Sequence, residues 1–236
     1  MENPVARIRP LKSSDEPATK FGITKASLAE LATANVKSAL SPITLAIWVV
    51  LCSSFLQYMQ WWPGANAPFY KYLSIVPICI AFIAPIIALA DWVNRPYFEE
   101  RTQTILHGPD MTSLYEYYNK SGNGFWLLEY GDTKVGFIAA ERKGDTTHVT
   151  HLYVDEPFRK AHAQNDLLEY AIKEAFSTDG IVAVTGETSP FSAYIGKAYK
   201  TLGFFQASSG TKRVGIYRWK VGQTWRLSRE EWESKK

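Results

Sequence analysis

Two long apolar segments constrain this chain more than any other feature. Residues 43–62 carry no charged side chain, and residues 72–93 contain their first charge only at Asp91. About twenty helical residues cross the roughly 30 Å hydrocarbon core of a bilayer. A short link, residues 63–71, joins the two segments. The sequence therefore predicts a transmembrane hairpin whose two ends lie on the same side of the membrane.

Two other arrangements of these segments stay open. The hairpin can enter the membrane without crossing it, or a soluble domain can bury both helices as a pair. Pro77 and Pro85 favour a membrane helix, because neighbouring helices there can satisfy the carbonyl groups that a proline leaves free. Tryptophans near the segments fit the aromatic belts of membrane interfaces: Trp48, Trp61, Trp62 and Trp92.

Charge and cysteine content exclude several classes. The net charge of +3 includes no polybasic block, so a nucleic-acid partner is not expected. Cys52 and Cys79 both fall in the apolar segments, which argues against a disulfide framework, and no metal-ligand spacing occurs. Lysine and arginine lie mainly outside the link, as at Lys37 and Arg95, and this bias predicts that both termini face the cytosol.

The remaining sequence alternates strand and helix patterns. A strand is expected at residues 5–11, and a capping box at Ser27 and Glu30 predicts a helix toward Leu40. After the hairpin we expect a helix from Asp110 to Asn119. Further on we expect strands at 124–130, 134–140, 148–154, 181–185, 204–206 and 214–219, with helices at 164–176 and 192–202. This order predicts one mixed α/β fold with the apolar hairpin inserted.

Three segments of this fold resemble the GNAT superfamily of acyl-CoA-dependent N-acetyltransferases. Residues 152–168 resemble its motif A, Tyr199-Lys-Thr-Leu-Gly-Phe204 resembles the end of its later helix, and Lys134-Val-Gly-Phe137 resembles its strand hairpin. With the apolar insert, residues 5–219 resemble the membrane-anchored GNATs, which include the cysteine-S-conjugate and aspartate N-acetyltransferases. The domain would then comprise residues 1–42 and 94–219, the insert residues 43–93, and a C-terminal tail residues 220–236.

The resemblance implies acetyl-CoA as substrate and an amine as acceptor. It implies that the backbone of Leu152, Tyr153 and Val154 pairs with pantetheine. The pyrophosphate would bind the following loop and helix start, where free N–H groups favour an anion: Arg159, Lys160, Ala161, His162, Ala163 and Gln164. Tyr199 would protonate the leaving thiolate. Glu187 is the first candidate for the general base, and His151 is the second.

The phosphate loop departs from the family pattern. Small residues are usual at the positions of His162 and Gln164, because a missing Cβ lets phosphates approach the backbone. Two interpretations stay open. Either Arg159, Lys160 and His162 bind phosphate through their side chains, or the site no longer binds CoA. In the second case the fold serves the assembly, packaging or trafficking of another membrane protein.

The sequence thus predicts an acetyltransferase of an internal membrane, the endoplasmic reticulum, with its α/β domain in the cytosol. The acceptor stays open between a small amino acid or conjugate and a lysine of a membrane protein. Trp225 and Trp232 stand among charged residues in the tail. This tail is expected to lie on the membrane or to dock a partner, or else to be a frayed end.

Overall fold

The computed structural model describes residues 5–64 and 68–234 and comprises two compact units. The first unit combines Met1–Ser27, Arg101–Lys212 and Arg218–Lys236. The second unit combines Leu28–Glu100 with Arg213–Tyr217. The long helices α1 (Glu16–Ala39) and α4 (Ile75–Leu106) each contribute residues to both units.

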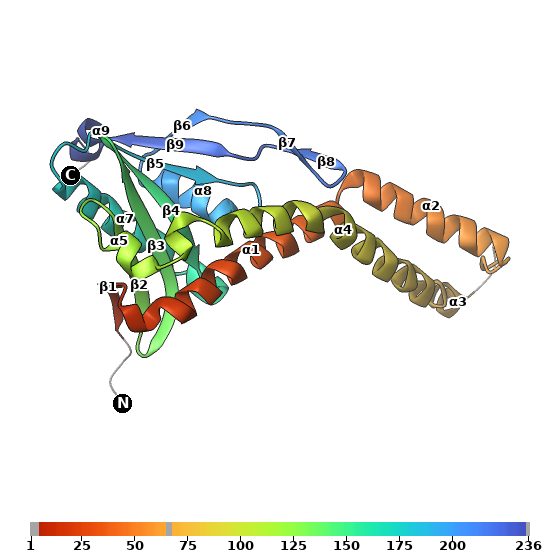
Figure 1. The fold of residues 1–236 in the computed structure, drawn as a ribbon. Helices are drawn as coiled ribbons and strands as arrows, with labels where there is room; N and C mark the ends of the chain where they lie inside the picture. The colour runs from red at the N-terminus through yellow and green to blue at the C-terminus, as the bar shows by residue number, and fades with distance from the viewer. Residues whose placement is uncertain (1–4, 65–67, 235–236) are drawn as a thin grey trace. The chain divides into compact units, whose positions relative to one another are not determined.

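A seven-stranded sheet forms the centre of the first unit (Figure 1). Its strands follow the order β1-β2-β3-β4-β5-β9-β6, and only β4 and β5 pair in parallel. The strands are β1 (Ala6–Pro10), β2 (Gly124–Tyr130), β3 (Thr133–Lys143), β4 (Thr146–Val154), β5 (Ala183–Thr188), β6 (Phe205–Ser208) and β9 (Gln223–Ser228). This mixed sheet confirms the predicted α/β class.

Residue alternation along the strands gives the sheet two buried faces. On β2, Leu127 belongs to one apolar cluster and Leu128 to the other. Successive strand residues point to opposite faces, so the two clusters lie on opposite sides of the sheet. The smaller cluster also takes Ile23 of α1 and Leu114 of α5 (Leu114–Tyr118), which follows the 3₁₀ turn η2 (Pro109–Met111).

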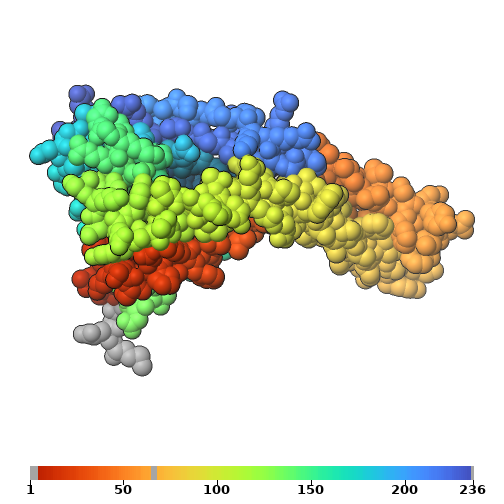
Figure 2. Space-filling model, viewed as in Figure 1, coloured from red at the N-terminus to blue at the C-terminus, as the bar shows by residue number. Residues whose placement is uncertain are grey.

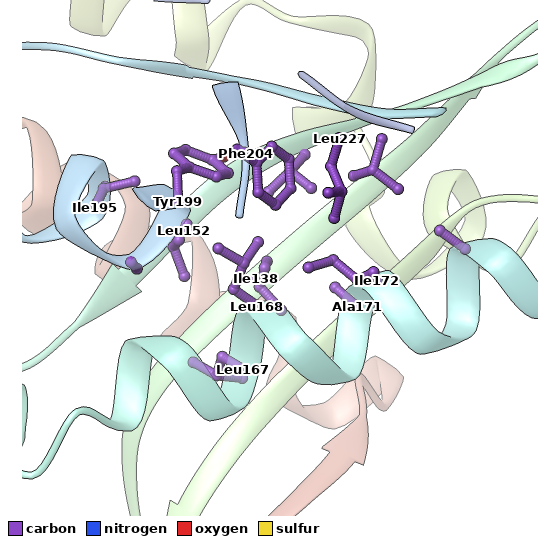
Figure 3. Close-up of a cluster of buried hydrophobic side chains, with 14 of the residues drawn as sticks. Ile138, Leu152, Leu167, Leu168, Ala171, Ile172, Ile195, Tyr199, Phe204 and Leu227 are labelled. Atoms are coloured by element: carbon purple, nitrogen blue, oxygen red, sulfur yellow. The ribbon is translucent and has the colours of Figure 1, made fainter. Parts of the chain in front are cut away.

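The larger cluster is covered by α7 (Ala163–Ser177) and α8 (Ala193–Thr201), as Figure 3 shows. The apolar spacing of residues 164–176 predicts one buried helix face. That face is buried as expected: Leu167, Leu168, Ala171, Ile172, Ala175 and Phe176. The short helix α6 (Glu156–Arg159) connects β4 to α7. Helix α7 therefore fixes the loop at its N-terminus against the end of β4.

The C-terminal segment corrects one expectation. Residues 223–228 are not a surface tail but strand β9, which lies between β5 and β6 and leads into α9 (Arg229–Glu233). Trp225 is 3% exposed and Trp232 is 8% exposed, so both pack in the core rather than on a membrane. The alternation of Trp225 and Leu227 with polar residues is that of a strand with one buried face.

The segment 214–219 also differs from its expected structure. Residues 214–219 were expected to close the sheet as one strand. They contribute instead to a separate two-stranded ribbon of β7 (Lys212–Val214) and β8 (Tyr217–Trp219). Gly215 at the turn has φ 60°, and a Cβ there would lie 2.3 Å from the side-chain oxygen of Asn94. The turn therefore needs glycine for both its conformation and its space.

Two helices extend beyond their expected ends. Helix α1 begins at Glu16, after the 3₁₀ turn η1 (Ser13–Asp15), and not at the capping box of Ser27. Pro17 falls in the first turn, where a missing N–H costs no helical bond. Helix α4 continues past Val93 to Leu106. Arg95 pairs with Asp91 one helical turn earlier, and such a pair supports a helix that is exposed to water.

The second unit contains the apolar helices. Helix α2 (Pro42–Tyr58) packs against α4, and the short α3 (Phe69–Leu73) precedes α4 (Figures 1 and 2). The indole N–H of Trp48 donates to the carbonyl of Cys79 at 3.0 Å, and the rings of Phe55 and Phe82 lie 5.5 Å apart.

Membrane-spanning potential is clearest in the segment Phe69–Leu106. Its most apolar window has a mean hydropathy of 2.6 and is 0% buried, so one helix is long and apolar enough to cross a membrane. Helix α2 meets the same criterion only together with the Ser13–Ala39 segment, across a bend of 57°. The second crossing of the expected hairpin stays a prediction.

Candidate active site

Strands β4 and β5 separate after a short paired region. They pair in parallel only over residues 146–149 of β4 and 183–186 of β5. Both strands then continue, to Val154 and Thr188, without pairing with each other. The unpaired stretch forms an opening in the centre of the sheet, which we call the β4–β5 opening.

A β-bulge on β4 accompanies this opening. Phe137 of β3 pairs with Tyr153, whereas Ala139 pairs with Thr150, so β4 has one extra residue here. His151 lies in the bulge with φ 50°, in the left-handed region. A bulge bends its strand and increases the local twist, which directs the end of β4 away from β5.

The outer edge of β4 presents backbone polar groups to the opening. The N–H of Asp155 donates to the carbonyl of Val135 on β3 at 2.8 Å. Backbone groups alternate in direction along a strand, so those of Val154 and Leu152 point to the opposite side, toward the opening. Those of Tyr153 point toward β3. The expected pairing of Leu152, Tyr153 and Val154 with pantetheine stays a prediction.

Arg159 crosses the end of the opening. Its Nε donates to the carbonyl of Val154 at 2.7 Å. Its guanidinium lies 4.1 Å from the ring centre of Tyr194 on α8 and 5.6 Å from that of Tyr153 on β4. The side chain therefore connects β4 to α8, and a ligand that pairs with Val154 must compete with it for the carbonyl.

The expected phosphate loop ends at the start of α7. His162 occupies the N-cap position of this helix and has φ 60°. The side chains of Lys160, Ala161 and His162 are exposed. Gln164 is 4% exposed, and its Nε2 donates to the carbonyl of Arg159 at 3.4 Å, so its side chain folds inward. Ala163 and Gln164 belong to the first turn of α7, where backbone N–H groups have no helical acceptor and can receive an anion.

Tyr199 lies at the apex of the opening. Gly186 and Val149 are the last paired residues of β5 and β4, and a Cβ on Gly186 would lie 2.0 Å from the Tyr199 hydroxyl oxygen. The Tyr199 ring stacks on Trp225 and packs edge-on against Phe204. Burial raises the pKa of Tyr199, and the negative charge of Glu187 acts in the same direction. The raised pKa weakens this phenol as an acid, so its expected role toward a thiolate stays a prediction.

The two candidate bases lie beside this apex on different strands. Glu187 follows Gly186 on β5 and is exposed. His151 lies on β4 beyond Val149, and its Nε2 is 2.8 Å from Oδ2 of Asp110. The charge of Glu187 acts on the Tyr199 phenol, whereas the His151 side chain contacts Asp110, which also accepts from Tyr118 of the smaller cluster. The catalytic roles of Tyr199, Glu187 and His151 stay predictions.

Sequence reasoning missed the partners of these residues. Asp110 was expected only as the start of a helix, and no local pattern links it to His151. Trp225 was placed in a tail, whereas it stacks on Tyr199 and donates from its indole N–H to the Thr188 hydroxyl at 2.9 Å. The alternating pattern around Trp225 is the one signal that could have revealed β9.

The second unit contains apolar cavities. Two apolar cavities of about 330 and 420 Å³ are lined entirely by residues of the second unit. The first is bordered by Leu45 and Ile87, and the second by Phe55 and Pro77. Within residues 5–64 and 68–234, no three His, Cys, Asp or Glu side chains gather in a metal-binding arrangement.

The parallel strands β4 and β5 separate beside a bulge, next to the N-terminus of α7, within one mixed α/β sheet. The family model for the acetyltransferase (GNAT) domain matches residues 94–219. The chain therefore belongs to the GNAT acetyltransferase family, as the sequence resemblance predicted. The membrane-anchored subgroup within that family stays a prediction.

Solved structures similar to this chain include several acetyltransferases. Spermidine N-acetyltransferase from Vibrio cholerae, in complex with CoA and spermine, has 7% identity over 97% of this chain and 98% of that chain, with a TM-score of 0.52. A GNAT-family acetyltransferase from Staphylococcus aureus Mu50 has 13% identity over 95% of this chain and 99% of that chain, with a TM-score of 0.48. One from Elizabethkingia anophelis with acetyl-CoA bound has 15% identity over 52% and 86%, with a TM-score of 0.40. The search of curated proteins found no match.

Proposed function

We propose that this protein is a membrane-anchored N-acetyltransferase that binds acetyl-CoA in the β4–β5 opening. The observation that carries the proposal is the unpaired edge of β4, where Leu152 and Val154 direct backbone groups toward the opening. Family membership supports acetyl-CoA as the acyl donor and an amine as the acceptor. The N-terminus of α7, at Ala163 and Gln164, supplies N–H groups for the pyrophosphate.

The reaction would be a direct transfer without a covalent enzyme intermediate. The neutral amine nitrogen attacks the thioester carbonyl carbon, and a backbone N–H of β4 stabilises the oxyanion that forms. A base removes one proton from the attacking nitrogen, the C–S bond breaks, and the thiolate takes a proton from Tyr199. The products are an N-acetyl amine and CoA. His151 and Glu187 are the two candidates for the base.

The acceptor belongs to the class of primary amines. A small amino acid or conjugate is one form of it, as the resemblance to the cysteine-S-conjugate and aspartate enzymes supports. A lysine of a membrane protein is the other. An acceptor that arrives at the membrane surface suits an enzyme whose catalytic domain is anchored there.

The second unit provides the proposed anchor, with spans at about residues 43–62 and 72–93. Helices α2 and α4 expose apolar side chains that water would disfavour, including Ile43, Val50, Ile80 and Leu89. Lipid tails are the occupant that their charge-free surface fits. The proposed membrane is internal, the endoplasmic reticulum, with the GNAT domain in the cytosol.

A polar cluster lies where both proposed spans end. Asn94 is 2% exposed and donates to the side chains of Asn35 at 3.0 Å and Ser38 at 3.1 Å. Asn35 donates in turn to Asp91 at 2.7 Å. Polar groups so close to uncharged helices support a membrane interface at this end of the hairpin.

Cysteine labelling tests the topology. In a variant with Cys52 and Cys79 replaced by alanine, Gly64→Cys places a thiol between the spans and Glu156→Cys places one on the GNAT domain. We expect Glu156→Cys to react with a membrane-impermeant maleimide in vesicles with the cytosolic face outward, and Gly64→Cys to react only after permeabilisation. Labelling of Gly64→Cys in intact vesicles would contradict a crossing hairpin and support a re-entrant one. Release of the protein by alkaline carbonate would contradict the anchor altogether.

A non-catalytic role in assembly, packaging or trafficking of another membrane protein is the second candidate. The position of Arg159 favours it, because this side chain already holds the Val154 carbonyl and packs on Tyr194. The non-glycine residues His162 and Gln164 favour it as well. In this alternative the β4–β5 opening is closed to CoA and the fold serves as a scaffold.

Calorimetry with acetyl-CoA on detergent-purified full-length protein separates the two candidates. The enzyme proposal predicts micromolar binding that excess CoA abolishes. A matched variant, His162→Gly with Gln164→Gly, reports whether the loop limits access. Binding by this variant alone, with none by the natural sequence, would overturn the enzyme proposal and favour the scaffold.

A further inference from the structure

The bulge of β4 holds His151 against a carboxylate. The Nε2 atom of His151 lies 2.8 Å from Oδ2 of Asp110, and each side chain is 14% exposed. Asp110 belongs to η2, which precedes β2, β3 and β4 in the sequence. The left-handed backbone of His151, with φ 50°, is a costly conformation that the fold maintains at this residue.

Asp110 is held as a carboxylate. Burial acts to raise its pKa, but hydrogen bonds from His151 and Tyr118 outweigh burial and hold the pKa below its ordinary value. The Tyr118 hydroxyl donates to Oδ2 at 3.0 Å, and burial raises the pKa of this phenol, so it stays a donor. A carboxylate with two donors has no proton to give to His151.

This arrangement determines which imidazole nitrogen can accept a proton. Because the Asp110 carboxylate only accepts, Nε2 of His151 must carry the hydrogen and donate it. In the neutral ring Nδ1 then has a free lone pair. If Nδ1 takes a proton, the resulting imidazolium remains paired with Asp110, which stabilises the charge.

The position of His151 on β4 suits a base for the attacking amine. It follows Val149, the last residue of β4 that pairs with β5, and it precedes Leu152, whose backbone faces the opening. Glu187, the other candidate, is an exposed residue of β5. His151 differs from it in being partly buried and oriented by a second residue, as effective general bases usually are.

Resting on the acetyl transfer proposed above, we infer that Nδ1 of His151 is the general base and that Asp110 is its positioning residue. One N–H proton of the attacking amine passes to Nδ1 as the nitrogen–carbon bond forms. The C–S bond then breaks, and the thiolate takes a proton from Tyr199. The proton on His151 returns to water, and the Tyr199 phenolate is reprotonated from water, which closes the cycle.

Several other groups face this pair and are relevant to any titration. Tyr118 of α5 bonds to Asp110 and lies 3.3 Å from the Thr150 hydroxyl of β4. Glu141 of β3 accepts from Tyr117 and pairs with Lys143 at 3.4 Å. These contacts are the reason that Tyr117→Phe is the matched control. It removes a hydrogen bond of the same helix without touching His151 or Asp110.

Nitrogen-15 NMR of labelled histidine tests the pair directly, because the chain has only four histidines. The sample is full-length protein in detergent, with His151→Gln used to assign its signal. We expect His151 to carry its proton on Nε2. In Asp110→Asn this preference for the Nε2 tautomer should be lost, because the amide side chain no longer offers acceptors alone. An unchanged tautomer in Asp110→Asn would overturn the positioning role of Asp110, and Tyr117→Phe should keep the Nε2 tautomer.

A kinetic test separates failure of the base from failure of the proposed function. CoA release from acetyl-CoA is followed with spermine, tyramine and lysine methyl ester as probe amines. We expect His151→Gln and Asp110→Asn to lower kcat by about 10²- to 10⁴-fold at unchanged KM for acetyl-CoA, with partial recovery in Asp110→Glu. No release by the natural sequence would overturn the proposed transfer itself. Release that persists in both variants would overturn the base assignment alone.

Discussion

His162 occupies a backbone conformation that favours glycine. Its φ of 60° lies in the left-handed region, which residues with a β-carbon rarely adopt, and the side chain is exposed. Such a conformation costs an ordinary residue about 1–2 kcal/mol. The sequence predicted a departure from the family pattern at this residue. It did not predict that the backbone would keep the conformation that glycine normally serves.

The first prediction follows from this strain. We expect His162→Gly to raise the free energy of unfolding by about 1 kcal/mol, because glycine adopts φ 60° without steric cost. Thermal unfolding in detergent measures the change. Lys160→Gly is the control, since Lys160 has φ −69° and gains nothing from glycine. A loss of stability in His162→Gly similar to that of Lys160→Gly would contradict the argument.

Gly186 leaves the space that the Tyr199 hydroxyl occupies. The second prediction is that Gly186→Ala lowers the free energy of unfolding by about 1–3 kcal/mol, because its methyl group would lie 2.0 Å from that oxygen. Tyr199→Phe removes the oxygen, so the double variant should recover part of the loss. Additive losses, measured by thermal unfolding of the four proteins, would show that the two residues do not interact.

The candidate site residues could be selected by type from the sequence, but their arrangement could not be predicted. Tyr199 was identified from the Tyr-x-x-x-Gly-Phe pattern, and its place at the apex depends on Gly186, which no sequence rule selected. His151 was a candidate on a strand, but its bulge and its contact with Asp110 depend on strand register and on the position of η2. Long-range contacts of this kind have no local signature.

At the scale of elements, β9 is the largest departure from expectation. Its tryptophan was read as a membrane or partner contact because charged residues surround it. In the sheet, Arg226 is exposed on the other side of β9, and the charged residues that directly follow Ser228 belong to α9. Trp225 contacts Thr188 of β5 and Tyr199 of α8. The strand hairpin β2–β3 was predictable because a glycine stands between two apolar strand patterns. In the structure Gly131 lies in the two-residue turn and has φ 60°.

The third prediction concerns β9. We expect Trp225→Ala to cost about 3–5 kcal/mol of unfolding free energy, the usual range for a buried tryptophan. Phe205→Ala, on the neighbouring strand β6, should cost far less because Phe205 is 46% exposed. Chemical unfolding of both variants in detergent measures the difference. Equal effects would mean that residues 223–228 are peripheral after all.

An ion-pair network connects β1 to the rest of the sheet. Arg9 of β1 donates to Asp15 of η1 and to Glu129 of β2, each at 2.6 Å, and Lys134 of β3 reaches Asp15 at 2.7 Å. The hydrogen bond from Arg9 is the main cause that lowers the pKa of Asp15. Asp15 is only 5% exposed, so water screens the pairs weakly.

The fourth prediction uses the direction of this pKa change. A carboxyl with a lowered folded-state pKa stabilises the fold above its unfolded pKa of about 3.9, and the contribution is lost as the pH falls further. We expect Asp15→Asn to lose about 3 kcal/mol at pH 7, because Arg9 and Lys134 lose their partner. The difference from the natural sequence should shrink toward pH 2. A difference that does not change with pH would contradict the electrostatic origin.

At the scale of the whole molecule, one apolar insert accompanies one GNAT domain. The apolar helices α2 and α4 were predictable because composition alone marks residues 43–62 and 72–93, whereas the crossing of a membrane by both stays a prediction. The ends of these helices were not predictable, since α4 continues through Pro96 to Leu106 without a local stop. The mixed α/β fold of the GNAT domain was predictable from the order of its strands and helices, except that β9 and not the segment 214–219 completes the sheet.

The central claim is that acetyl-CoA lies along the unpaired edge of β4. Hydrogen–deuterium exchange of the full-length protein in detergent, with and without acetyl-CoA, tests it most directly. We predict slower exchange at residues 150–165, which include the edge of β4 and the start of α7, and no change at β6. Unchanged exchange over residues 150–165 at saturating acetyl-CoA would contradict the claim.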